Sequence, residues 1–362
     1  MLDKQLEIFR DKKILITGNT GFKGSWLTIW LLKLGANVIG YSKDIPTNPS
    51  LFEICKLKEK ITHFNKDILD KSSFEKVILE TQPDFIFHLA AQPLVRNSYK
   101  DPLSTIHSNS IGTVNLLEIL KTYKNNTIAI FVTSDKVYEN YEWIWGYKET
   151  DRIGGKDPYS ASKAMAEIAI RSYFHSFLNK KENLRIGVGR AGNVMGGGDW
   201  SKDRIVPDCM LKWTKNEEVI IRNPLSTRPW QHVLDPLSGY LTLAYELYNS
   251  KKQNGQAFNF GPINNLTFNV QELIETMISF WPKNTNSSVK IEKEKFPHEA
   301  VFLKLNCDKA GSLLSWTPRI EFKECVKMTI NWYENYYFNN EPILKYTENQ
   351  IDEFMKNLRN KN

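Results

Sequence analysis

A tyrosine and a lysine four residues apart are the most reactive pairing in this sequence. Tyr159 and Lys163 begin an amphipathic segment in which helical spacing places both side chains on one face. A nearby ammonium favours the phenolate form of a tyrosine and lowers its pKa from about 10. Ser134, at the end of an earlier apolar run, can share a substrate hydroxyl proton with this tyrosine. The three residues predict acid-base chemistry at a hydroxyl or carbonyl group.

A glycine-rich turn near the start of the chain predicts a dinucleotide site. The apolar run at 13–17 leads into GNTGFKG at 18–24 and then into an amphipathic segment. Glycine permits a tight turn and lets backbone N–H groups approach a pyrophosphate, whose charge a helix N-terminus favours. A plain glycine turn is the alternative, and the position at the first strand-to-helix connection argues against it. The expected contacts are Gly18, Thr20, Gly21, Phe22 and Gly24.

The end of the second expected strand leaves the choice between NAD and NADP open. An acid at this point would hydrogen-bond the ribose hydroxyls of NAD. Asp44 comes late for that role, and Lys43 could equally approach the 2′-phosphate of NADP.

Alternating apolar and amphipathic segments predict the elements that must hold these residues. Strands are expected at 13–17, 37–41, 85–89, 128–133 and 184–190, and helices at 24–34, 71–81, 103–123 and 160–178. The alternation implies parallel strands with helical crossovers, hence an α/β, Rossmann-type doubly wound sheet covered on both faces. Ligands of such a sheet bind beyond the carboxyl ends of the strands.

The second half of the chain predicts a smaller C-terminal substrate-binding lobe. After Asn193 the sequence changes to loops rich in Gly, Pro and Trp. A strand candidate at 257–260 follows a helix-like run at 237–248 and could return to the sheet. We therefore expect a dinucleotide-binding domain over 1–190 plus about 232–261, and a discontinuous lobe over 191–231 plus about 262–362.

Composition excludes several classes of protein. The 362 residues are 41% hydrophobic and 25% charged, which is ordinary for a globular protein. The net charge is +7 without a run of five basic residues, so a solvated surface with a mild preference for anionic ligands is expected rather than nucleic-acid binding. The first residues mix charges of both signs, unlike a signal peptide or membrane anchor, and predict a cytoplasmic protein. The four scattered cysteines indicate reduced thiols and no metal site.

Four motifs together resemble the extended short-chain dehydrogenase/reductase family. They are TGxxGFxG at 17–24, HLAAQ at 88–92, YxxxK at 159–163 and RAGNV at 190–194. The resemblance covers almost the whole chain and implies tightly carried NAD and a homodimer built from the helices at 103–123 and 160–178. It also implies cofactor contacts from Asp67, Ile68, Leu89, Ala90, Ala91, Tyr159 and Lys163. For Asp67, a helix N-cap is a comparable alternative.

Longer stretches resemble the nucleotide-sugar 4,6-dehydratases of this family, and in particular those acting on CDP-sugars. They are TSDKVYEN at 133–140, EWIWGYKETD at 142–151, AGNVMGGGDW at 191–200 and RPWQHVLDPLSGY at 228–240. The resemblance implies that Asp135 protonates a departing C6 hydroxyl and that Lys136 stands where relatives have a glutamate base. Which of the two residues takes the C5 proton stays open. The alternative for both is a structural role, as a turn with a surface ion pair. The resemblance also implies a product that feeds the deoxysugar pathways of bacterial surface polysaccharides.

Arg228 is the candidate clamp for the diphosphate of a nucleotide sugar, because a guanidinium matches two phosphate oxygens at once. Further candidates for substrate contact are Gln92, Arg190, Asn193 and Arg204, and a loop-ordering ion pair is an equal alternative for each arginine. Two rival functions remain: a nucleotide-sugar epimerase or reductase, and a non-catalytic NAD-binding regulator. Asp135 and Lys136 argue against the first, and the intact acid-base residues argue against the second.

Overall fold

Seven parallel strands form the centre of the molecule, in the order β11-β6-β5-β4-β1-β2-β3. The computed structural model describes residues 5–221, 223–262, 268–282, 287–292, 302–339 and 341–356. The strands of this sheet are β1 (Lys13–Thr17), β2 (Asn37–Ser42), β3 (Thr62–Asn65), β4 (Phe85–His88), β5 (Thr127–Val132), β6 (Leu184–Ala191) and β11 (Ala257–Phe260). The predicted doubly wound α/β fold is confirmed.

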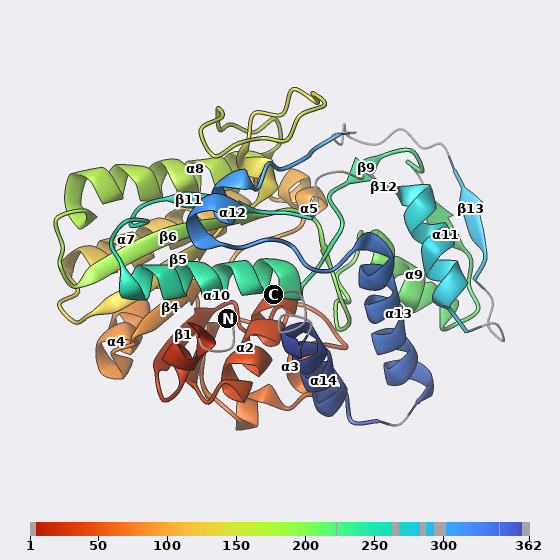
Figure 1. The fold of residues 1–362 in the computed structure, drawn as a ribbon, viewed down its shortest axis with the longest axis horizontal. Coiled ribbons are helices and arrows are strands. Elements are labelled where there is room, and N and C mark those ends of the chain that lie inside the picture. The colour runs from red at the N-terminus through yellow and green to blue at the C-terminus, as the bar shows by residue number, and fades with distance from the viewer. Residues whose placement is uncertain are drawn as a thin grey trace.

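Helices cover both faces of the sheet (Figure 1). Side chains alternate along each strand, so Ile14 and Phe87 enter one apolar core while Leu15 and Ile86 enter the other. The first core lies under α2 (Phe22–Lys33) and α10 (Leu234–Asn249), and the second under α4 (Lys71–Thr81), α7 (Gly112–Thr122) and α8 (Pro158–Tyr173). Burial on both faces explains why the strands read as nearly continuous apolar runs.

The chain reverses direction across the sheet at β1, which lies between β2 and β4. The next strand in sequence after β1 pairs on one side of it and β4 pairs on the other, both in parallel. In sheets of this kind the ligand crevice opens beyond the carboxyl ends of the strands at such a point. The glycine turn after β1 and the HLAAQ segment after β4 therefore border one crevice.

Smaller elements beyond β6 form a second group, on the right of Figure 1. It comprises α9 (Ile205–Trp213), α11 (Val270–Phe280) and α13 (Phe322–Phe338), with strand β8 (Val219–Ile221) beside β13 (Val289–Ile291) and β9 (Thr227–Arg228) beside β12 (Phe268–Asn269). Strands β7 (Val194–Met195) and β10 (Gln231–His232) pair close to the main sheet.

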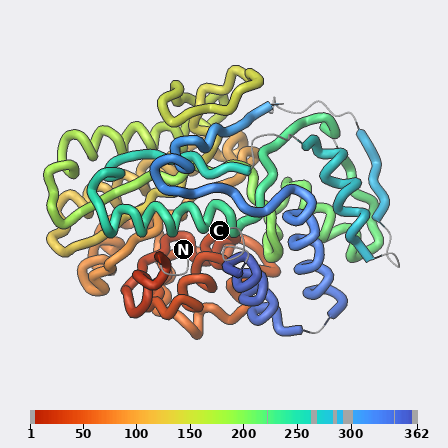
Figure 2. The backbone as a smooth tube through the Cα atoms, in the orientation of Figure 1, coloured from red at the N-terminus to blue at the C-terminus, as the bar shows by residue number. Residues whose placement is uncertain are grey.

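The C-terminal helices return to the sheet unit (Figure 2). Helix α12 (Asp308–Leu314) lies beside β11, and α14 (Ile343–Lys356) lies against α2. The Phe354 ring meets Trp30 edge to face at 5.6 Å between centroids, and Asp352 pairs with Lys33 at 3.0 Å. The two-domain division drawn from the sequence stays a prediction. No helix in the described ranges is both long and apolar enough to cross a membrane.

The expected helices are present, with two irregularities. The segment expected at 103–123 is α6 (Pro102–Ile106), a π-helical turn (His107–Ile111) and α7, and a second π-helical turn (Phe174–Leu178) follows α8. The edge strand β3 is not among the strands expected above, because its side chains are partly exposed and show no apolar run. The remaining short helices are α3 (Leu51–Ile54) and α5 (Val95–Lys100), with 3-10 turns at Glu7–Phe9, Leu57–Glu59 and Asp135–Val137.

Candidate active site

Two glycines of the first turn occupy positions that no side chain fits. Gly18 has φ +75°, a left-handed conformation, and a Cβ there would lie 2.8 Å from the backbone nitrogen of Ala90. A Cβ on Gly24 would lie 2.1 Å from the carbonyl oxygen of Gly18. The turn after β1 therefore approaches both its own helix and the segment after β4 with bare backbone.

The N-terminus of α2 is shaped for an anion. Its N-cap, Gly21, is extended and provides no side chain to the first N–H groups of the helix, and Phe22 is the first helical residue. The hydroxyl of Thr20 donates to the carbonyl of Asp44 at 2.7 Å, which ties the turn to the end of β2. These features fit the pyrophosphate of a dinucleotide.

Asp67 faces the end of β2 rather than capping α4. One carboxylate oxygen accepts the backbone N–H of Leu69 at 3.0 Å, and the other lies 3.7 Å from the ammonium of Lys43. The N-cap of α4 is Asp70. The cap alternative for Asp67 is therefore wrong, and its neighbour Ile68 is buried.

The HLAAQ segment runs along the opposite side of the same crevice. Leu89 donates its backbone N–H to the Thr17 carbonyl at 3.1 Å, and Ala90 donates to the Thr17 hydroxyl at 3.2 Å. After Ala91, the amide of Gln92 donates to the Leu94 carbonyl and the Thr105 hydroxyl, each at 3.0 Å. Gln92 therefore holds its own loop, whereas the sequence had suggested substrate contact.

The acid-base residues meet at the carboxyl end of β5. Tyr159 and Lys163 are buried on the first turns of α8, and Ser134 begins the 3-10 turn Asp135–Val137. The Ser134 hydroxyl donates to an oxygen of Asp135 at 2.8 Å and lies near enough to Tyr159 to act on the pKa of that phenol. Segments far apart in the chain thus bring a phenol, a hydroxyl and a carboxyl together.

Burial sets the proton affinities of this pair. It raises the pKa of Tyr159 to about 12, although Ser134 and Arg204 oppose the shift. It lowers the pKa of Lys163 to about 8, which Glu167 opposes. The expectation that the lysine would lower the phenol pKa does not hold for the protein alone, because burial outweighs the charges around Tyr159.

Asp135 is buried and one of its two carboxylate oxygens accepts no hydrogen bond from the described residues. Its side chain is 1% exposed, and Oδ2 has no hydrogen-bond partner in the described part of the chain. A Cβ on Gly192 would lie 2.9 Å from this oxygen, so a glycine in RAGNV leaves it room. Lys136, next in sequence, is half-buried, and Glu139 is paired with Arg152 at 2.8 Å.

One of the three candidate arginines, Arg228, lines open space beyond these residues. Arg228 borders a cavity of about 830 Å³ between its own strand and the elements α11 and α13, with Trp230 and Phe268 among its walls. That volume falls within the roughly 300–1,000 Å³ typical of small-molecule sites. Arg204 pairs with Asp199 at 2.8 Å and acts electrostatically on Tyr159. Asn193 lies between β6 and β7, and its carbonyl accepts from Gln231.

The third, Arg190, lies inside the protein. Its guanidinium donates to both carboxylate oxygens of Glu167, and the two side chains are 5% exposed or less. The structure therefore gives Arg190 an internal partner in place of the substrate contact suggested by its sequence.

Sequence reasoning missed Glu167 and Asn109. Glu167 lies four residues after Lys163, and this helical spacing was the available signal. Asn109 lies in the first π-helical turn and donates to the Ser162 hydroxyl at 2.8 Å. The only hint was a polar run, HSNS, inside an expected helix.

Known proteins with similar sequences were found along almost the whole chain. The sequence model of the GDP-mannose 4,6-dehydratase family matches residues 15–329. The CDP-glucose 4,6-dehydratase of Salmonella typhimurium is 43% identical over 98% of this chain and 99% of that protein. The dTDP-D-glucose 4,6-dehydratase of Dictyostelium discoideum is 32% identical over 69% of this chain and 58% of that protein.

Solved structures share the fold at lower identity. An epimerase from Methanothermobacter thermautotrophicus superposes with a TM-score of 0.79 at 24% identity, covering 93% of this chain and 96% of that one. The dTDP-glucose 4,6-dehydratase of Bacillus anthracis, solved in complex with NAD, superposes with a TM-score of 0.74 at 22% identity, covering 93% and 99%.

Proposed function

This chain belongs to the GDP-mannose 4,6-dehydratase family, and on that premise we propose that it is an NAD-dependent hydro-lyase that converts CDP-glucose to CDP-4-keto-6-deoxyglucose and water. The 43% identical CDP-glucose 4,6-dehydratase, matched along almost its full length, supports this substrate. The observation that carries the proposal is the buried Asp135 beside Ser134 and Tyr159. Epimerisation or simple reduction at C4 needs no second proton donor there.

The first role is proton removal at C4. Tyr159 accepts the proton of the C4 hydroxyl, and the Ser134 hydroxyl orients both groups. Bound NAD would accept a hydride from C4 and later return it to C6. The positive charge of the oxidised nicotinamide would also favour the phenolate form of Tyr159 against the effect of burial.

The second role is elimination of water across C5 and C6. A carbonyl at C4 acidifies the C5 proton, which Lys136 accepts and later returns to C5 when C6 receives the hydride. Asp135 donates a proton to the C6 hydroxyl as the C6–O bond breaks and water leaves, and the proton that Tyr159 took from the C4 hydroxyl balances this loss. The role of Asp135 is supported by its second carboxylate oxygen, which accepts no hydrogen bond from the described residues.

The third role is recognition of the nucleotide diphosphate. Arg228 binds the diphosphate at the edge of the large cavity, and Arg204 and Asn193 assist nearer the sugar. The cavity wall carries Trp230, Phe268 and Phe322, which offer apolar surface to a base.

We place the protein in the cytoplasm, since its four buried cysteines are free thiols.

Mass spectrometry after incubation with CDP-glucose tests the proposed function. We expect a product lighter by one water. A product of unchanged mass would instead support an epimerase, and an unchanged substrate with bound cofactor would support a non-catalytic NAD-binding protein.

We predict that the cofactor released by denaturing the protein is NAD. Lys43 lies 3.7 Å from Asp67, so part of its charge is neutralised and it is a poor partner for a 2′-phosphate. A hydride that leaves and returns within one cycle makes exchange with solution unnecessary. Chromatography of the denatured protein identifies the cofactor. Recovery of NADP, with NAD unable to restore activity, would reverse the assignment.

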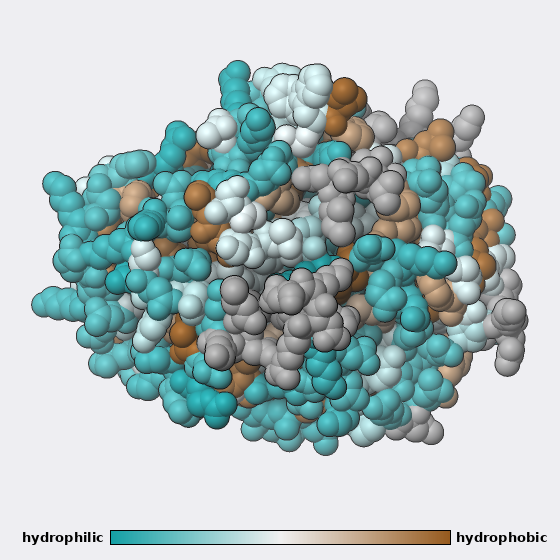
Figure 3. Space-filling model, viewed as in Figure 1, coloured by the Kyte–Doolittle hydropathy of each residue, from teal (hydrophilic) through white to brown (hydrophobic). Residues whose placement is uncertain are grey.

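We also predict a homodimer formed through α7 and α8, which lie side by side on one face of the sheet. Ile111, Met165, Ile168 and Phe177 are large apolar side chains in or next to these helices and are exposed. The face in Figure 3 is mainly hydrophilic, with small scattered apolar spots among its described residues. Light scattering at micromolar concentration should give twice the chain mass, and the mass of a single chain would reject the dimer.

A further inference from the structure

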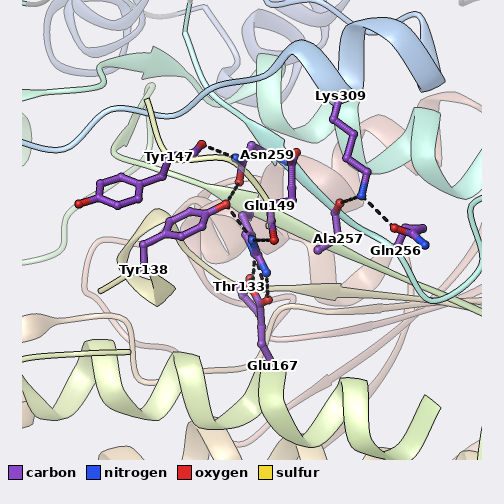
Figure 4. Close-up of polar contacts among 10 residues, drawn as sticks. Thr133, Tyr138, Tyr147, Glu149, Glu167, Gln256, Ala257, Asn259 and Lys309 are labelled. Carbon is purple, nitrogen blue, oxygen red and sulfur yellow. Dashed lines mark hydrogen bonds and ion pairs between the residues drawn. The ribbon is translucent and has the colours of Figure 1, made fainter. Parts of the chain in front are cut away.

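A buried ion pair connects the two halves of the acid-base site (Figure 4). Arg190 is on β6 and Glu167 is on α8, one helical turn beyond Lys163. The Nε of Arg190 lies 2.9 and 3.0 Å from the two carboxylate oxygens, and its terminal nitrogen makes a further short contact. This pair therefore fixes the helix of Tyr159 and Lys163 to the sheet.

The same pair holds both ends of the turn that carries Ser134, Asp135 and Lys136. The Thr133 hydroxyl, immediately before the turn, donates to Glu167 at 2.6 Å. Arg190 donates to the Tyr138 hydroxyl, just after the turn, at 2.7 Å, and its guanidinium lies 4.9 Å from the centre of that ring. Two hydrogen bonds, one from Thr133 and one to Tyr138, therefore hold the two ends of the turn to one ion pair. We call this arrangement the bracket.

The bracket extends into the neighbouring loop. Tyr138 donates to the side-chain carbonyl of Asn259 on β11 at 2.7 Å. The Asn259 amide donates in turn to the Tyr147 carbonyl at 2.9 Å, and its backbone N–H donates to Glu149 at 2.8 Å. Figure 4 shows these side chains converging from the sheet, the helix and the loop.

Stability alone does not account for an ion pair in this place. The desolvation of two buried charges offsets most of their attraction, so apolar residues of similar volume serve stability at least as well. Directional hydrogen bonds do what apolar contacts cannot, because they fix orientation. A displacement of about 1 Å at a reacting group can cost on the order of a hundredfold in rate.

We propose that Glu167 and Arg190 are a positioning pair, which sets the turn 134–137 in register with Tyr159 and Lys163 through the hydroxyls of Thr133 and Tyr138. The inference rests on the proposed function for its kinetic consequences and on the contacts above for its structural ones. Neither residue touches the substrate. Glu167 also opposes the fall in the pKa of Lys163 that burial causes, so its carboxylate acts on both sides of the site.

Tyr138→Phe is the sharpest test, because it removes one hydroxyl and keeps the ring. In holoenzyme, amide hydrogen exchange at Lys136 and Val137 should accelerate by at least about tenfold. Turnover of CDP-glucose should fall by about tenfold or more with KM within about twofold. Because the Lys136 side of the turn is loosened, the 4-keto intermediate that retains its C6 oxygen should accumulate.

Thr133→Val loosens the other end, beside Ser134 and Glu167. It should slow the first oxidation instead, because the loosened end carries Ser134, which orients the substrate hydroxyl toward Tyr159. The two variants therefore predict different slow steps from one bracket.

Tyr147→Phe is the matched control. Its hydroxyl is in the same loop and hydrogen-bonds Asn140 and the backbone of Tyr141, but it does not reach the ion pair. It should leave exchange at 136–137 and the slow step unchanged, whatever it does to the melting temperature. Two results would show that the pair has no positioning role. One is that Tyr138→Phe and Tyr147→Phe each lose turnover only in proportion to the fall in their melting temperatures. The other is that amide exchange at 136–137 is unaltered in Tyr138→Phe.

Failure of the proposed function would be visible separately. Parent enzyme that leaves CDP-glucose unchanged would refute that function, while the exchange measurement, which needs no substrate, would still decide whether the pair orders the turn.

Discussion

Replacing Tyr159 with phenylalanine should remove most of the turnover while leaving the fold and the bound NAD in place. The hydroxyl is the proposed proton acceptor at C4, and general acid-base groups contribute roughly 10² to 10⁴-fold to rate. The ring is buried at the start of α8 and its shape is preserved by the change. The measurement is kcat at saturating CDP-glucose, together with the melting temperature and the NAD content of the purified variant.

Tyr173→Phe provides the comparison on the same helix. Its hydroxyl donates to Glu118 at 2.7 Å at the C-terminal end of α8, the opposite end of the helix from Tyr159, so activity should stay near that of the parent. Turnover of Tyr159→Phe within severalfold of the parent would remove this tyrosine from the mechanism.

The second large effect that we predict is a change in the product that the enzyme forms, rather than a loss of all activity. The double variant Asp135→Asn with Lys136→Met should still reduce enzyme-bound NAD on addition of CDP-glucose. It should then retain a 4-keto hexose that keeps its C6 oxygen. The reason is positional, since both residues follow Ser134 on the turn beyond β5 and serve the sugar beyond C4. Absorbance of reduced cofactor and rapid-quench mass analysis report the two steps.

The two single variants distinguish the role of Lys136 from that of Asp135. With C5-deuterated substrate, Lys136→Met should keep the deuterium, because the proposed base is gone. Asp135→Asn should exchange it yet retain the C6 oxygen, because the proposed acid is gone. A structural role for Lys136, such as neutralising phosphate, predicts weaker binding with normal products. An ion pair between Lys136 and Glu139 is a further structural alternative, but in the structure Glu139 pairs with Arg152 at 2.8 Å. Dehydration by the double variant at near-parent rate would place the C5 base elsewhere in the substrate lobe.

Local patterns in the sequence were sufficient for the framework of the site. The five strands expected in the first half and the strand at 257–260 lie in the sheet, because buried parallel strands are apolar throughout and this needs no knowledge of their partners. The glycine turn and the pairing of Tyr159 with Lys163 were predictable for the same reason. Both depend on spacing over one or two turns of chain, and backbone geometry converts that spacing directly into position.

Only the tertiary structure decided the properties that depend on neighbours distant in sequence. Arg190 was a candidate for the substrate until β6 placed it against Glu167, 23 positions earlier in the chain. Gln92 was a second candidate until its loop used both of its amide hydrogens. The direction of the Tyr159 pKa shift was reversed by burial, which no local pattern reports. Sequence spacing determines which side chains share an element, whereas solvation and charge pairing depend on which elements meet.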